Sequence, residues 1–171
     1  MDGTVQKQSG IALLILGSLC LLGAREENSD PIPFPREYRR WAHVKSAIVG
    51  PQSAAFATEA GIHHIYANDE AIEGYLSGKF PDGSILVYDL LETSEVQGNT
   101  VEGSERRVDV MVKRSARYPE TGGWGFASFA AGDREPGAPK SGCFDCHAGG
   151  ESHDSVFSEF RAIQSLSQAA R

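Results

Sequence analysis

The spacing of apolar residues changes several times along the chain, and each change marks a predicted element. From Arg36 apolar positions recur every three or four residues, which predicts a helix that stops at Gly50-Pro51. The periodic positions of this helix are Tyr38, Trp41, Val44, Lys45 and Ile48. The tail from Ser155 has the same helical spacing, at Val156, Phe157, Phe160, Ile163 and Leu166. Helices are therefore expected near both ends of the folded region.

Between these helices, four segments are typical of β-strands because β-branched and aromatic residues are dense or alternate in them. The links between the later strands are too short for helical crossovers, so these strands should pair antiparallel. The four predicted strands are residues 61–67, 84–91, 107–113 and 124–129.

A short helix and a tight turn separate the first two of these strands. Asn68 or Asp69 can cap the helix, and Gly78 can end it. Pro81-Asp82-Gly83 then predicts a turn, because proline presets one φ and glycine accepts a positive one. The sequence thus predicts an α+β fold: a single domain with a mainly antiparallel β-sheet flanked by a few helices.

The first part of the chain is predicted to lie outside this domain. Residues 11–24 carry no charge, follow Lys7 and end in small residues, which is the pattern of a secretory signal peptide. The run is shorter than the ~20 residues that a membrane-spanning helix needs. We therefore expect a signal peptide at 1–24, a flexible lead-in at 25–33 and the domain proper at 34–171. The mature protein would be periplasmic or otherwise exported.

Composition narrows the function without identifying it. The 171 residues include 16 Lys and Arg against 23 Asp and Glu, a formal net charge of −7. This acidic balance argues against a nucleic-acid partner, which would need clustered cations for the phosphates. A hydrophobic content of 40% is too high for a disordered chain.

One motif carries specific chemistry. Residues 143–147 read Cys-Phe-Asp-Cys-His, the C-x-x-C-H pattern of c-type haem attachment. Cys143 and Cys146 can bond the two vinyl groups of one porphyrin, and His147 can then ligate the iron. The motif therefore predicts one covalently bound haem c, which agrees with export because such haem is attached outside the cytoplasm.

Two other uses of the motif are open. A redox-active disulfide between Cys143 and Cys146 would normally follow a strand, whereas here the motif follows a loop rich in glycine and proline. A structural zinc site needs four ligands, and with His153 these two cysteines supply three.

The second axial ligand decides between an electron carrier and a reactive site. The candidates are Met111, His43, His63, His64 and His153. Met111 is interpreted as a strand residue that packs on the sheet, and His43 as a helix residue. His63 and His64 should point to opposite faces of their strand. We therefore expect an iron with one open face, which binds or transforms small ligands.

The segments 78–92 and 108–129, followed in order by CFDCH at 143–147, resemble the cytochrome P-460 family, which includes the cytochromes c′-beta. The resemblance implies a homodimeric, mainly antiparallel β fold with c-type haem and an open distal face. Relatives with a lysine cross-linked to the porphyrin resemble hydroxylamine oxidisers, and those without it look like nitric-oxide binders.

Within that resemblance, Lys79 stands where the family's cross-linking lysine is expected, and an ordinary solvated loop lysine is the alternative. Lys113 is a weaker candidate, expected to be a surface residue. Three functions thus remain: an oxidoreductase acting on hydroxylamine, a non-enzymatic nitric-oxide binder, or an electron-transfer protein. Each of the two redox functions needs a redox partner protein.

The pocket above the iron should be apolar, which excludes water and favours neutral diatomic molecules. Its candidate wall residues, each of which could equally be ordinary core, are Phe56, Phe80, Trp124 and Phe126. Asp133 and Glu135, in the loop before the motif, are candidate proton donors or acceptors.

Overall fold

The structure is a computed structural model that describes residues 31–135, 137 and 142–161, together with residues 1 and 3. The predicted signal peptide and the first part of the lead-in fall outside the described residues, as does the chain after 161. Within the described part, no helix is both long and apolar enough to cross a membrane.

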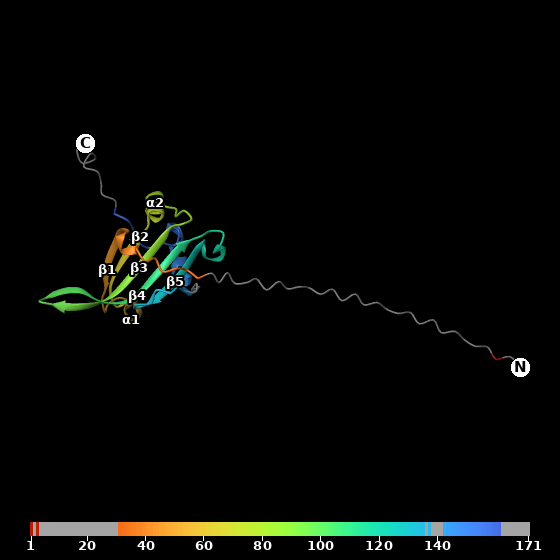
Figure 1. Cartoon of the computed structure of the whole chain (residues 1–171), viewed down its shortest axis with the longest axis horizontal. Helices are drawn as coiled ribbons and strands as arrows, with labels where there is room; N and C mark the ends of the chain where they lie inside the picture. Colours follow the sequence, from red (N-terminus) through yellow and green to blue (C-terminus); the bar gives the residue numbers. More distant parts are fainter. Residues whose placement is uncertain (2, 4–30, 136, 138–141, 162–171) are drawn as a thin grey trace, which may run out of the picture.

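Five strands form one sheet in which each strand pairs antiparallel with the next along the chain (Figure 1). The α+β fold with a mainly antiparallel sheet is thereby confirmed, and so are the four predicted strands. The strands are β1 Ala42–Val49, β2 Gly61–Ala67, β3 Ile85–Val96, β4 Asn99–Lys113 and β5 Trp124–Ala130.

Short helices connect and cover these strands. The predicted helix after β2 is confirmed: the Asn68 side chain accepts a hydrogen bond from the Ala71 N–H, and Gly78 ends the helix at a φ of 80°. The α-helices are α1 Phe56–Glu59, α2 Asp69–Ser77 and α3 Gly142–His147. The 3₁₀ helices are η1 Tyr38–Arg40, η2 Pro119–Thr121 and η3 Ala148–His153.

The helix predicted from Arg36 is wrong. A single 3₁₀ turn, η1, is followed at once by strand β1, which pairs with β2. The register of that pairing shifts between His43 and Lys45, a β-bulge that adds one residue to the strand. The extra residue breaks the two-residue alternation, so apolar positions fall three and four apart although the backbone is extended.

The helix predicted from Ser155 is also wrong as far as the chain is described, because residues 155–161 have no helical structure. Asp154 and Ser155 have positive φ angles of 53° and 63°, which turn the chain sharply after η3. Val156 is then buried against the sheet. Tertiary packing overrides the local periodicity here.

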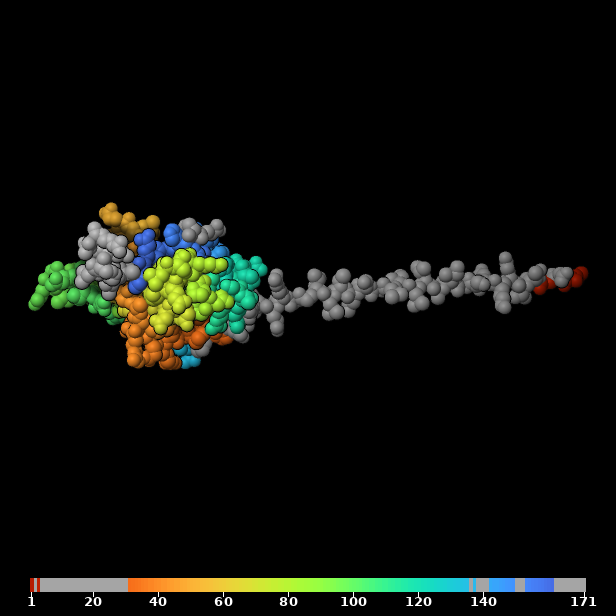
Figure 2. Space-filling view, turned by 90° about the horizontal axis from the view of Figure 1, so that it is seen from above, coloured from red at the N-terminus to blue at the C-terminus, as the bar shows by residue number. Residues whose placement is uncertain are grey.

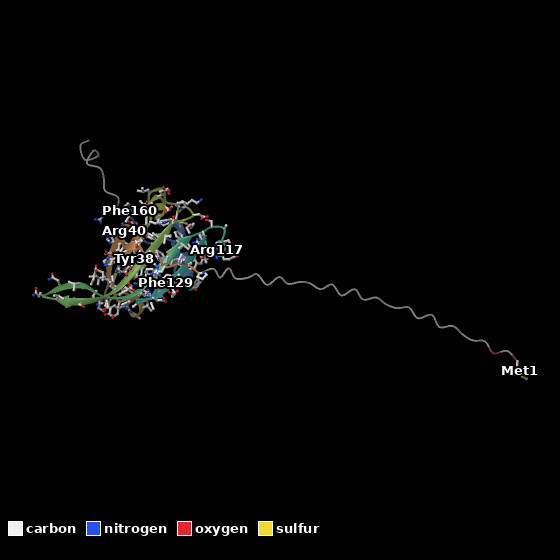
Figure 3. The ribbon with its side chains drawn as sticks, viewed as in Figure 1. Met1, Tyr38, Arg40, Arg117, Phe129 and Phe160 are labelled. Atoms are coloured by element: carbon white, nitrogen blue, oxygen red, sulfur yellow. The ribbon has the colours of Figure 1, made fainter. Side chains whose placement is uncertain are left out.

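Two apolar clusters cover the two faces of the sheet, since adjacent residues of a strand point to opposite sides. We name the first the Tyr38 cluster; it contains Ile32, Phe34, Tyr38, Val87, Val108, Val110, Val112, Tyr118, Ala127 and Phe129. Tyr38 and Phe129 are labelled in Figure 3. We name the second the Trp124 cluster; its buried members are Val44, Ala67, Ala71, Phe80, Leu86, Trp124, Phe126 and Val156.

The end of the lead-in belongs to the Tyr38 cluster. Ile32 is fully buried and forms an isolated antiparallel bridge with Gly137, and Phe34 packs edge-on against Phe129. The end of the predicted lead-in therefore packs on the domain through Ile32. Apolar side chains in a proline-rich segment can still fill a sheet face.

β3 and β4 run well beyond the predicted strands and form a hairpin that projects from the body (Figures 1 and 2). Gln97 and Gly98 close it with positive φ angles of 51° and 80°, as a two-residue hairpin turn requires. Nearly all side chains of its outer half are exposed. None of the described helices or strands packs on this half, which agrees with the lack of apolar alternation in its sequence.

Candidate haem site

The two cysteines and the histidine of the motif lie on α3, as the second, fifth and sixth of its six residues. Residues three and four apart share one face of a helix, so Cys143, Cys146 and His147 point to the same side. Cys143 packs against the Trp124 cluster, whereas Cys146 is exposed. The helix thus presents two thiols and an imidazole together beside an apolar surface.

His147 is oriented by one hydrogen bond and two rings. Its Nδ1 lies 2.8 Å from the backbone oxygen of Ser155, and a carbonyl can only accept, so Nδ1 carries the proton. The imidazole lies between the rings of Phe126 and Phe157, at 5.2 and 5.1 Å between centroids. Nε2 therefore keeps a lone pair that is available to a metal ion.

Three of the four predicted pocket residues gather near the motif. Phe80, Trp124 and Phe126 belong to the Trp124 cluster, which the partly buried Cys143 and Phe144 also contact. Phe56 does not join them: it lies on α1 and is 40% exposed. Its placement in the pocket wall stays a prediction.

Asp133 and Glu135 are not near α3 either. Their loop lies against the Tyr38 cluster, where the guanidinium of Arg134 sits 4.3 Å from the Phe34 ring centroid and bonds both oxygens of Glu105. Asp133 accepts a hydrogen bond from the Glu135 N–H and both residues are exposed. The loop precedes the motif in sequence but packs on the other face of the sheet.

One carboxylate that contacts the Trp124 cluster, Asp154, was missed by sequence reasoning. Its Oδ1 lies 2.6 Å from Nζ of Lys113, and its Oδ2 accepts a hydrogen bond from the Phe80 N–H. Lys113 is 5% exposed, so its prediction as a surface residue is wrong. Strand alternation was the available signal, because it places Lys113 on the same face as Met111.

The alternative axial ligands are distributed over both faces. His43 and His64 share the hydroxyl of Ser46, at 2.8 and 2.6 Å. His63 stacks on Tyr88, and its Nδ1 lies 3.2 Å from that phenol; burial lowers the pKa of His63. His43 lies in β1, so its predicted place on a helix is wrong.

Met111 differs from these histidines because it packs within the Trp124 cluster, as Cys143 does. Its prediction as a strand residue that packs on one sheet face is confirmed.

A second polar group that the sequence did not indicate lies next to His63. The Glu59 carboxylate receives two hydrogen bonds from Arg107, of 2.7 and 2.6 Å, and one from the Tyr88 hydroxyl. Burial alone would raise the pKa of Glu59, but these hydrogen bonds and the Arg107 charge lower it. Arg107 also bonds Asp109, so its donors are engaged by carboxylates from a helix and a strand.

Lys79 lies directly after α2 and is exposed. A cavity of about 290 Å³ adjoins it, bounded by α2 and the segment 153–160, with Gly78 and Phe80 in its wall. Figure 2 shows this segment, in blue, beside α2, and Phe160 of the same wall is labelled in Figure 3. The three motif residues do not line the cavity, so it is distinct from the surface that α3 presents.

The structure also bears on the other uses of the motif. Cys143 and Cys146 are not joined by a disulfide. In the described part of the chain, no three His, Cys, Asp or Glu side chains are grouped to hold a metal ion, so His153 does not complete a site with the cysteines. A thiol pair followed by an oriented imidazole matches the donor set of a covalently attached haem.

A small antiparallel sheet with such a motif packed on one face defines a class, the haem cytochromes built on β-structure instead of a helical bundle. The family model for cytochrome P460 matches residues 35–158, so the chain belongs to the cytochrome P460 family. The protein is accordingly a haem cytochrome. Among curated proteins, none matches the sequence.

Proposed function

We propose that the protein is an exported cytochrome with one haem c, bonded through Cys143 and Cys146 and ligated by His147. The hydrogen bond from His147 Nδ1 to Ser155 carries the proposal, because it leaves Nε2 ready to bind iron. When bound, haem would supply an iron that can change oxidation state and bind a small ligand.

We propose small, neutral nitrogen compounds, hydroxylamine and nitric oxide, as the ligands. The support is the family membership together with the aromatic side chains of Phe80, Trp124 and Phe126 beside the motif. An apolar surrounding penalises ions far more than small uncharged molecules. The packing of His43 and His64 on Tyr66, which lies beside the Tyr38 cluster on the other face of the sheet, further favours an iron that is open on its second face.

An electron carrier is the second candidate, and Met111 is the observation that favours it. Its thioether packs in the cluster that Cys143 contacts, and methionine as second ligand is typical of electron-transfer haem. Absorption spectra of the purified protein separate the two. We expect a five-coordinate, high-spin haem that binds nitric oxide; a six-coordinate, low-spin spectrum that is lost in Met111→Leu would establish the carrier instead.

Lys79 separates an enzyme from a gas binder within the main proposal. A haem-peptide digest in which porphyrin is joined to Lys79, together with a red-shifted Soret band, supports hydroxylamine oxidation with electrons passed to a redox partner protein. Ordinary c-haem spectra with rapid nitric-oxide binding and no hydroxylamine turnover support the non-enzymatic form. A secreted protein without any bound haem would refute both.

Export and assembly are proposed on separate grounds. The uncharged run at 11–24 supports cleavage after residue 24, which N-terminal sequencing of the secreted protein tests. The homodimer is proposed from the family resemblance. Light scattering at micromolar concentration should give twice the mass of the mature chain, and a monomer mass would reject the dimer.

A further inference from the structure

We propose that Lys113 and Asp154 form a positioning pair that sets the orientation of His147 and, through it, the ligand field of the haem iron. The inference rests on the proposed role of His147 as iron ligand. It adds two residues that the haem motif itself does not contain.

Asp154 is held at three points. One carboxylate oxygen lies 2.6 Å from Lys113 Nζ, and the other accepts a hydrogen bond from the Phe80 N–H at 3.1 Å. Its backbone oxygen accepts a hydrogen bond of 2.8 Å from the indole N–H of Trp124. Contacts to β4, β5 and the loop after α2 thus fix this one residue on the sheet.

Lys113 is an unusual partner because its charge is buried. The ammonium lies 4.8 Å from the Trp124 ring centroid and donates to the Gly122 oxygen at 2.9 Å. A buried ammonium destabilises a fold unless a negative charge accompanies it, and Asp154 supplies that charge. The ion pair therefore holds the segment after α3 on the sheet, in addition to the apolar packing of Val156.

The position of Asp154 determines where the next carbonyl points. Asp154 and Ser155 both adopt left-handed φ angles, which residues other than glycine keep only when their surroundings enforce them. A hydrogen bond from the Val156 N–H to the His153 oxygen closes this turn, and Ser155 is buried. Its oxygen then faces His147 Nδ1 at 2.8 Å.

The hydrogen bond to Ser155 sets how His147 can rotate between Phe126 and Phe157. A strong acceptor at Nδ1 makes the imidazole a better donor to a metal at Nε2. Loss of the ion pair between Lys113 and Asp154 should lengthen or misalign the hydrogen bond from His147 to Ser155. Nε2 of His147 would then donate more weakly to iron. A weaker donor stabilises ferrous over ferric iron, so the reduction potential should rise.

The test uses the haem-loaded protein and the variants Asp154→Asn, Lys113→Met and Lys113→Arg. We expect Asp154→Asn and Lys113→Met to raise the reduction potential and to lower the iron–histidine stretching frequency in resonance Raman spectra. Lys113→Arg keeps the charge and should stay near the wild-type values. The two neutralising variants bear on the inference separately, so one of them suffices if the other does not fold.

Asp89→Asn is the control, because Asp89 is a carboxylate on the opposite face that is even more deeply buried than Asp154 and is bonded to Tyr38 and Arg39. It should lower stability but leave the potential and the Raman band unchanged. If the neutralising variants keep their covalent haem and lose only stability, as Asp89→Asn does, the pair is merely structural and the inference fails. A wild-type protein without covalent haem would instead overturn the proposed function, and this inference with it.

Discussion

The two faces of the sheet are completed in different ways. On one face, the Tyr38 cluster closes with ring contacts such as Phe34 on Phe129, and its buried charge, Asp89, is bonded by Tyr38 and Arg39. On the other face, the Trp124 cluster is bordered by the half-buried Cys143 and Phe144.

Beyond that border, on the side of α3, Cys146 is exposed and Phe157 is 61% exposed. The Phe157 ring packs on His147, so an exposed apolar side chain lies directly beside the motif on this face. Protein side chains thus cover the first face, whereas we propose that haem covers the exposed part of the second.

We expect the largest effect from substitutions that prevent the covalent attachment of haem to this second face. In Cys143→Ser/Cys146→Ser, no thioether can form, so we expect complete loss of the haem that survives denaturation. Haem staining of a denaturing gel measures it, and the Tyr38 cluster should keep the hydrogen-exchange protection of β4 and β5. Haem that stays attached to the double variant without a porphyrin bond to Lys79 would contradict the role of the motif.

Two glycines offer a sharper comparison, because each lies under an aromatic ring on a different face. A Cβ on Gly125 would lie 2.3 Å from the Tyr118 ring, and a Cβ on Gly74 would lie 2.3 Å from the Phe80 ring. Such overpacking typically costs about 2 kcal/mol, and in Gly74→Ala the better helix propensity offsets about half of it. Urea denaturation of the two variants measures both costs.

The glycine variants should differ in their effect on haem. Gly74→Ala displaces Phe80, whose N–H bonds Asp154, and should therefore alter the haem spectrum. Gly125→Ala acts on the Tyr38 cluster and should leave it unchanged. Identical haem spectra for Gly74→Ala and Gly125→Ala would contradict this separation of the two faces.

The sequence predictions were correct for some elements of the sheet and wrong for others. Strands β2, β4 and β5, the cap of α2 and the turn at Pro81 were predictable because local patterns agree with the final packing. The segment from Arg36 was mispredicted because a bulge near Val44 imitates a helical period. Side chains that are exposed on both faces left the outer β3–β4 hairpin without a pattern to recognise.

The site was predictable only in its covalent part. The motif at 143–147 is a local pattern, so Cys143, Cys146 and His147 could be singled out from sequence. Ser155 and Asp154 contribute a backbone oxygen and a charge through a turn of positive φ, which no residue pattern specifies. Lys113 was misplaced because a lone cation on a strand normally faces water.

Adjacent arginines on η1 test the closure of the Tyr38 cluster with a smaller effect. Arg39 bonds the buried Asp89, whereas Arg40 pairs with Glu37 at the surface, where the two side chains are 83% and 66% exposed. We expect Arg39→Ala to cost about 1 kcal/mol, since it leaves a buried carboxylate with one partner fewer, and Arg40→Ala less than about 0.5 kcal/mol. Chemical denaturation compares them; equal costs would show that Arg39 is not needed to satisfy Asp89.

The smallest expected effect is the loss of stability in acid. We expect a similar contribution to it from one carboxylate on each face of the sheet. Hydrogen bonds and the charge of Arg107 lower the pKa of Glu59 despite its burial. On the Tyr38 side, burial alone would raise the pKa of Glu105, but hydrogen bonds from Gly132 and Arg134 lower it. A carboxyl whose folded-state pKa is lowered stabilises the protein above its unfolded pKa of 4.5, and this stability is lost as the pH falls through the lower folded value.

The free energy of unfolding should therefore decrease between about pH 5 and pH 3, and each of Glu59→Gln and Glu105→Gln should flatten that decrease by about 0.5 kcal/mol. Both carboxylates are partly exposed, which is why the expected change is small. Urea denaturation at a series of pH values measures it with haem bound. Because neither carboxylate contacts the motif, the haem spectrum should not follow this titration. If it does so in wild type but not in Glu105→Gln, the Tyr38 side is coupled to the haem face and the two faces are less separate than their packing indicates.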